Sequence, residues 1–145
     1  MENDLSPALR DRIKRHEGFQ PEPYIDTLGH ITIGYGHKVE SITTEYAESL
    51  LSSDLNRALM DAIDLFYPDI WPKLSELRRG VLIEMVYQLG KTGVSKFVKM
   101  KAALDIGDYQ EAAAQMVDSQ WYEQTEGRCA RLAYIMRDDK EEEHG

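Results

Sequence analysis

Apolar residues at helical spacing open the chain, and this pattern stops at residue 18. A serine–proline pair at residues 6–7 is typical of a helix start, because serine caps the first turn and proline fits its first position. Leu9 and Ile13 follow on one face, four residues apart. Gly18 suits the left-handed position beyond a helix end, so we expect the helix to end with Glu17 in its last turn.

Residues 19–40 break the helical pattern. Five residues in this segment exclude a helix: Pro21, Pro23, Gly29, Gly34 and Gly36. Short strands are expected at 24–25 and 30–33, on either side of a turn at 26–29. So small an antiparallel sheet is not stable alone. It is therefore expected to pack on a helical body.

Helical spacing returns at residue 43 and continues to residue 66. The apolar positions of this helix are Ala47, Leu50, Leu51, Leu55, Ala58, Leu59, Ala62, Ile63 and Phe66. At about 1.5 Å per residue the helix is some 35 Å long, which is enough to join two lobes. The next helix is expected at 73–89, and it is apolar nearly all round between residues 81 and 87, so we expect it to be central and buried.

Shorter helices complete the pattern. They are expected at 94–104, at 108–117 after a capping-box-like start, and from Thr125 onward, where the apolar face is Cys129, Leu132, Ala133 and Met136. Trp121 and Tyr122 are expected in a short connecting segment, with Trp121 in the core. The pattern as a whole predicts a mostly helical α+β protein with one small sheet near its N-terminus.

Composition and charge narrow the class of protein to which the chain can belong. The chain has 145 residues, 42% of them hydrophobic, and a net charge of -9. Residues 138–145 hold five acids and one lysine, so the rest of the chain carries only -5 and residues 138–145 are expected to be a disordered acidic tail. The excess of acidic over basic residues argues against a nucleic-acid binder, which would carry a basic face.

The cysteine content and the distribution of apolar residues indicate the compartment. Cys129 is the single cysteine, so no intrachain disulfide can form and a reducing compartment is expected. No stretch approaches the roughly 20 apolar residues of a membrane span. Residues 1–15 are polar and lack the apolar core of a signal peptide, so we expect synthesis in the cytoplasm and no membrane insertion.

Two carboxylates near the N-terminus are candidates for chemistry. Glu17 would lie at the negative end of a helix dipole, which disfavours its charged form and favours a group that can donate a proton. Asp26 would lie in the turn of the small sheet. Taken alone, each has a simpler explanation, because glutamate is common at exposed helix ends and aspartate is common in turns.

A set of motifs, in order along the chain, favours a chemical role for the two carboxylates. Residues 16–18 (HEG), 24–27 (YIDT) and 32–37 (TIGYGH) resemble the active-site segment of phage lysozymes, the T-even and lambdoid endolysin type of glycoside hydrolase family 24. Residues 78–94 (RRGVLIEMVYQLGKTGV) look like the central helix of that family, and 120–131 (QWYEQTEGRCAR) is similar to a later family segment. The resemblance covers nearly the whole chain.

The resemblance implies a fold and roles for the acids. A small β lobe at about 19–40 and a helical lobe at about 73–137 with helix 7–17 would be joined by helix 43–66, with a cleft between the lobes and a single domain over 1–137. Glu17 would protonate the leaving glycosidic oxygen, while Asp26 would hold a water on the other face of the sugar or stabilise the developing positive charge. Thr32 would help to place that water. The resemblance also implies an inverting reaction. In inverting enzymes the two carboxyl groups lie farther apart than in retaining enzymes, which leaves room for the water molecule.

Further positions are matched one by one. Arg128 matches a residue that faces the catalytic glutamate, although without the match it would be read as a surface arginine. His37 matches a histidine that pairs with an acid on the long helix, here Asp54, and we interpret this pair as structural. His16 departs from the acid of T-even lysozymes and would alter the pH optimum. Positions that match or flank the cleft are Tyr24, Lys38, Tyr87, Gln88 and Gln124, with a core role for Tyr87 as the alternative.

The expected reaction is hydrolysis of the β-1,4 bond between N-acetylmuramic acid and N-acetylglucosamine in peptidoglycan, by a monomer, with no cofactor or metal. The histidines at 16, 30 and 37 have no clear ligand spacing. As in phage endolysins, the protein would reach the wall after holin-dependent release. Two alternatives stay open: a glycosidase acting on a chitin-like polymer, and a lysozyme-like module that binds peptidoglycan without cutting it.

Overall fold

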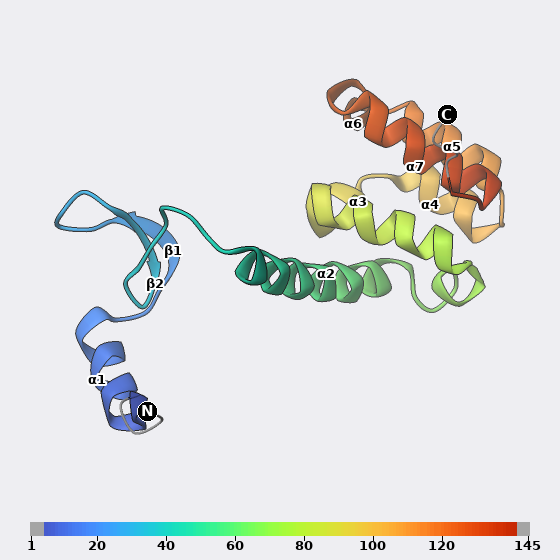
Figure 1. Ribbon diagram of the computed structural model, residues 1–145. Coiled ribbons are helices and arrows are strands. Elements are labelled where there is room, and N and C mark those ends of the chain that lie inside the picture. Colours follow the sequence, from blue (N-terminus) through green and yellow to red (C-terminus); the bar gives the residue numbers. More distant parts are fainter. Residues whose placement is uncertain (1–4, 142–145) are drawn as a thin grey trace. The chain divides into compact units, whose positions relative to one another are not determined.

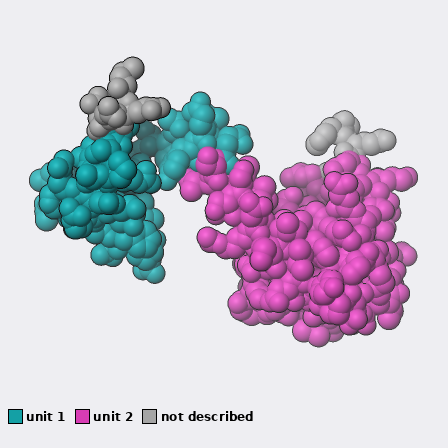
Figure 2. Space-filling view, turned by 90° about the horizontal axis from the view of Figure 1, so that it is seen from below, with its two compact units in different colours: residues 1–48 teal, residues 49–145 magenta. Residues whose placement is uncertain are grey.

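The computed structural model describes residues 5–141 of the chain. It divides into two compact units, Met1–Glu48 and Ser49–Gly145, which are coloured separately in Figure 2. The protein is α+β, mostly helical with one three-stranded antiparallel sheet near the N-terminus, as the hydrophobic pattern predicts (Figure 1).

The first unit begins with helix α1 (Pro7–Glu17). The Ser6 hydroxyl accepts a hydrogen bond from the backbone N–H of Leu9, and Pro7 occupies the first helical position, so the predicted start is confirmed. Gly18 follows with φ +70°, and its N–H donates to the carbonyl of Lys14. The helix therefore ends where the sequence predicts, with Glu17 in its last turn.

The sheet is a meander of β1 (Gln20–Ile25), β2 (Ile31–Gly34) and β3 (His37–Lys38), in that order (Figure 1). Strand β1 is longer than predicted and includes two prolines. It is an edge strand with an irregular register between Gln20 and Tyr24, so the missing proline N–H groups interrupt no regular ladder. The tight turn that joins β1 to β2 lies at Asp26–Gly29, as expected.

Helix α2 (Thr44–Phe66) confirms the predicted long helix. The Thr43 hydroxyl accepts from the N–H of Tyr46 and caps its start. Of the apolar positions expected on one face, only Ala58, Ala62 and Phe66 are buried.

The second unit continues with a short 3-10 helix (Trp71–Lys73) and then the central helix α3 (Glu76–Ser95). The prediction that α3 begins at Lys73 is wrong, because Ser75 caps the helix by accepting from the N–H of Arg78. Gly90 breaks the helical geometry with φ +77°, as expected for a closing glycine, but a further turn continues to Ser95. Val94 therefore lies in the last turn of α3 and does not begin the next helix.

Four shorter helices follow: α4 (Val98–Asp105), α5 (Tyr109–Val117), α6 (Gln120–Gln124) and α7 (Glu126–Asp138). Asp108 caps α5 by accepting from the N–H of Glu111, as predicted. Residues 121–122 lie in helix α6 and not in a connecting segment. Thr125 precedes α7, but its hydroxyl donates to the carbonyl of Trp121 and does not cap that helix.

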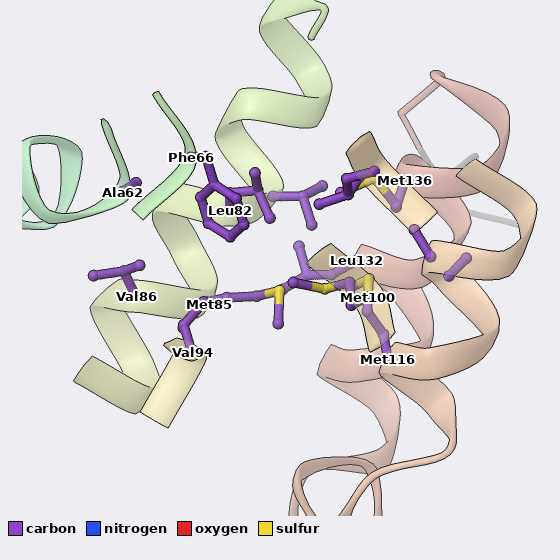
Figure 3. Close-up of a cluster of buried hydrophobic side chains, with 14 of the residues drawn as sticks. Ala62, Phe66, Leu82, Met85, Val86, Val94, Met100, Met116, Leu132 and Met136 are labelled. Carbon is purple, nitrogen blue, oxygen red and sulfur yellow. The ribbon is translucent and has the colours of Figure 1, made fainter. Parts of the chain in front are cut away.

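The hydrophobic core of the second unit surrounds α3. Figure 3 shows Leu82, Met85 and Val86 of α3 beside side chains from α2, α4, α5 and α7. The predicted face of α7 is buried in this cluster, including Cys129, and Trp121 is buried as predicted. Only one face of α3 is buried in this cluster, and Gly80 and Tyr87 lie exposed on the other, so the expectation of a buried helix is confirmed for one face and wrong for the other.

The acidic end of the chain is only partly described. Asp138 is the last residue of α7, and the carboxylate of Asp139 accepts a hydrogen bond from the Ser75 hydroxyl at 2.6 Å. Residues 142–145, which make up half of the predicted tail, lie outside the described residues. Within residues 5–141, no helix is long and apolar enough to cross a membrane.

Candidate active site

Glu17 is presented at the end of α1, where Gly18 turns the chain away from the helix. Its side chain is exposed, and its carboxyl group lies directly against Gly36 in the turn between β2 and β3. A methyl group placed on Gly36 would lie 2.6 Å from Glu17 Oε2 and 2.8 Å from its Cδ. The absence of a side chain at residue 36 therefore makes the space that the glutamate occupies.

Aromatic contacts connect the end of α1 to the same turn. The rings of Phe19 and Tyr35 have their centroids 5.3 Å apart, and Lys14 Nζ lies 5.5 Å from the centroid of Tyr35. Lys14 and Phe19, which make these contacts, lie on either side of Glu17 in the sequence. They hold the helix end near the turn that accommodates the glutamate.

Asp26 is held by the turn that it begins. Its Oδ1 accepts two backbone hydrogen bonds, from the N–H of Leu28 at 2.9 Å and from the N–H of His30 at 2.7 Å. The pKa of Asp26 is lowered below its ordinary value, chiefly because the backbone N–H of His30 stabilises the carboxylate. Burial opposes this effect, while the N–H of Leu28 and the side chain of His30 add to it. One oxygen is thus committed to the backbone, while Oδ2 makes no backbone hydrogen bond.

Thr32 lies at the centre of the sheet and is 2% exposed. Its hydroxyl donates to the carbonyl of His30 at 3.0 Å, so the oxygen keeps lone pairs that can accept from another donor. Tyr24 on β1 and Lys38 on β3 are its direct cross-strand partners. Since opposite residues of antiparallel strands share a face, three of the predicted site residues form one row across the sheet.

In the second unit, Gln88 and Trp121 form a pair. The indole N–H of Trp121 donates to Gln88 Oε1 at 3.0 Å, and Trp121 is 3% exposed. This bond satisfies the buried indole through the carbonyl oxygen of Gln88, and the predicted binding of substrate by Gln88 stays a prediction. Gln124 lies near this pair, on the wall of a pocket of about 460 Å³ that is also lined by Phe97 and Lys96.

Tyr87 is 42% exposed, so the alternative that it is a core residue is wrong. It lines a shallow pocket of about 430 Å³ together with Leu51, Leu55 and Arg128. Its position on an open surface of α3 is consistent with a role in contacting a ligand.

Arg128 has a partner that the sequence did not suggest. Its Nε donates to Oε2 of Glu84 at 2.8 Å, and both side chains are partly exposed. The expected contact of Arg128 with Glu17 would join residues of different units and stays a prediction. The same holds for the pairing of His37 with Asp54.

The remaining predicted residues are placed as follows. His16 is exposed on α1 beside Glu17, and Asp54 is exposed on α2. His37 is exposed on β3, with its ring centroid 5.9 Å from that of Tyr46. Among residues 5–141, no group of three or more histidine, cysteine or acidic side chains is placed to hold a metal ion.

Three residues that contact predicted site residues were not identified from the sequence: Gly36, His30 and Glu84. Gly36 belongs to a quoted motif, but only the fold shows that Glu17 lies against it. His30 stands four residues after Asp26, at the end of a turn that was predicted, so its proximity could have been inferred. Glu84 lies 44 residues from Arg128 in sequence, and no local signal connects the two.

Comparison with known proteins identifies the family of the chain. The family model described as phage lysozyme matches residues 14–141. The pre-baseplate central spike protein Gp5 of Enterobacteria phage T4 is 29% identical over 166 residues, covering 95% of this chain and 29% of that protein. This chain thus corresponds to less than a third of the spike protein.

Two further relatives are nearer to this chain in length. The probable T4-type lysozyme 2 of Dictyostelium discoideum is 28% identical, covering 88% of this chain and 92% of that protein. An endolysin of Acyrthosiphon pisum secondary endosymbiont phage 1 is 29% identical, covering 72% of each. The family match extends over most of the chain and includes both candidate carboxylates. The chain therefore belongs to the phage lysozyme family, a family of lysozyme-type glycoside hydrolases.

Proposed function

We propose that this protein is a muramidase that lyses bacterial cell walls by hydrolysing the β-1,4 bond between N-acetylmuramic acid and N-acetylglucosamine. The observation that carries the proposal is the state of Asp26. Its Oδ1 is held by two backbone N–H groups, while Oδ2 makes no backbone hydrogen bond, on a sheet that also presents Thr32. A carboxylate fixed through one oxygen can use the other on a water molecule.

In the proposed reaction Glu17 is the general acid. Its protonated carboxyl group donates to the glycosidic oxygen as the bond from that oxygen to C1 of muramic acid breaks. A water molecule attacks C1 from the opposite face, and Oδ2 of Asp26 accepts the proton that the water loses. Thr32 positions this water through a free lone pair of its hydroxyl. Exchange of protons with solvent then restores both carboxyl groups.

Other residues support the acids. The turn at Gly36 leaves room for the Glu17 carboxyl group, which a side chain at residue 36 would displace. Tyr24 and Lys38 flank Thr32 on the sheet, and Tyr87 and Gln124 lie on open surfaces of the second unit. We assign these four residues to binding of the glycan strand, because tyrosine rings pack on sugar faces and polar side chains bond to their hydroxyl groups.

The test is turbidity clearing of purified peptidoglycan by the protein and by Glu17→Gln. The variant is expected to lose activity by a factor of about 10² or more, as is usual when a general acid is removed. Glu22→Gln is the matched control, because it makes the same change at an exposed glutamate on β1. The products are reduced with borohydride, and a muramidase leaves muramic acid, not glucosamine, at the reduced ends.

The results separate the proposal from its alternatives. Clearing that survives Glu17→Gln would refute the assignment of the acid. Binding of intact protein to the wall without any clearing would refute the enzyme and favour a binding module. Faster cleavage of a chitin polymer than of peptidoglycan would refute the substrate.

A further inference from the structure

His30 lies against the one oxygen of Asp26 that the turn leaves free. Its Nδ1 is 3.4 Å from Asp26 Oδ2, while its backbone N–H donates to Oδ1. The distance from Nδ1 to Oδ2 is longer than an ordinary N–H···O hydrogen bond of about 2.7–3.2 Å. Within the described part of the chain, Nδ1 is a buried side-chain nitrogen without a hydrogen-bond partner.

This contact has two states that differ by one proton. In the neutral imidazole, the nitrogen near Asp26 can carry a lone pair, and Oδ2 stays available. In the protonated imidazole, both nitrogens carry hydrogen. The hydrogen on Nδ1 then needs an acceptor because the atom is buried, and the nearest acceptor is Oδ2. A small rotation of the ring would close the gap to a charge-assisted hydrogen bond.

Within residues 5–141, His30 is the one side chain that forms an ion pair with Asp26. The other influences on the Asp26 carboxylate are the backbone N–H groups of His30 and Leu28, which hold Oδ1. On the neighbouring strands, the titratable groups of the same face are Tyr24 on β1 and Lys38 on β3. Over residues 5–141, no ion pair joins either of them to Asp26.

We propose that His30 is a positioning residue that sets the acid limit of activity, because its protonated ring pairs with Asp26 Oδ2 and blocks the oxygen that must accept a proton from water. This inference rests on the proposed role of Asp26 as the base. Histidine is the side chain that ordinarily changes charge between pH 5 and 8.

The pairing itself is tested without activity, by NMR titration of the histidine rings in the intact protein. The signal of His30 is identified by its loss in His30→Gln. Asp26→Asn keeps the oxygen that accepts from the turn but removes the negative charge, so the midpoint measured for His30 is expected to fall. Glu22→Gln removes a carboxylate elsewhere in the same unit and leaves the midpoint in place. An unchanged midpoint in Asp26→Asn, or an equal fall in both variants, overturns the pairing.

The effect on catalysis is tested by the pH profile of kcat. One pH unit below the measured midpoint of His30, the wild type is expected to retain about a tenth of its plateau activity. The His30→Gln variant stays neutral and retains nearly all of its own plateau at that pH. His144→Gln, the same change elsewhere in the chain, follows the wild type.

Two results overturn the role in catalysis. One is an acid limb that coincides in the wild type and His30→Gln. The other is a loss in His30→Gln that is the same at every pH, since a purely structural residue would behave in this way. If no form of the protein clears peptidoglycan at any pH, the proposed function fails, and the NMR titration still decides whether the pair forms.

Discussion

Replacing Gly36 with alanine tests how closely the Glu17 carboxyl group is held by the turn between β2 and β3. The backbone of Gly36 has φ +73°, which an alanine adopts at a cost of about 1–2 kcal/mol. The new methyl group would also lie 2.6 Å from Glu17 Oε2, whereas ordinary contact begins at 3.4 Å. The carboxyl oxygen must therefore move by about 0.8 Å or more.

The chain offers a matched control for this change. Gly34 has φ +70°, so alanine at this position meets a similar backbone cost, but its methyl group would enter open space. Both variants are expected to lose about 1–2 kcal/mol of unfolding free energy, because the end of the flexible Glu17 side chain can move aside at little cost. Only Gly36→Ala displaces the candidate acid, and a shift of about 1 Å can reduce turnover by about 10²-fold.

Urea denaturation gives the two stabilities, and clearing of peptidoglycan under saturating conditions gives kcat. Gly36→Ala should lose kcat by between 10- and 100-fold relative to Gly34→Ala, at nearly equal stability. Equal kcat in the two variants would refute the reasoning, since it would mean that the carboxyl group does not act from the place where the turn holds it. A much larger loss of stability in Gly36→Ala would show that Glu17 cannot move aside.

Three further predictions concern single contacts. Gln88→Leu removes the acceptor of the buried Trp121 N–H and should lower the unfolding free energy by about 1–3 kcal/mol in urea denaturation; an unchanged midpoint would mean that the indole finds another acceptor. Burial raises the pKa of Cys129 to about 11, so the thiol should react with a disulfide reagent at pH 8 only when urea unfolds the protein, and rapid reaction of the native protein would contradict this. Because the pKa of Asp26 is lowered in the folded state, its ionised carboxylate stabilises the fold above the ordinary carboxyl pKa of about 3.9. This contribution is lost as the pH falls through the pKa of the folded state. Asp26→Asn should therefore remove part of the acid-induced loss of stability, which a pH series of thermal melts measures.

The helix ends show how far local signals reach. Ser6, Gly18 and Asp108 act where the sequence predicts, because a cap needs only backbone groups a few residues away. The start of α3 was misplaced, although Ser75 carries the same kind of signal. Residues 71–73 form a separate 3-10 helix there, so α3 begins only after Ser75. At Gly90 the positive φ was predictable, but the turn that follows it depends on how Val94 packs in the core.

The sequence by itself determined the fold class, the end of α1 at Glu17 and the turn at Asp26, and its ordered motifs matched the phage lysozyme family. These features depend on neighbours within a few residues or on a pattern that is read in order. Only the tertiary structure decided that Gly36 makes room for Glu17, that Thr32 is buried between Tyr24 and Lys38, and that Gln88 is engaged by Trp121. Such contacts depend on strand register and helix packing, because a shift of one residue in register turns a side chain to the opposite face of the sheet. The register depends on packing across the whole fold, so a local stretch of sequence is not enough to predict it.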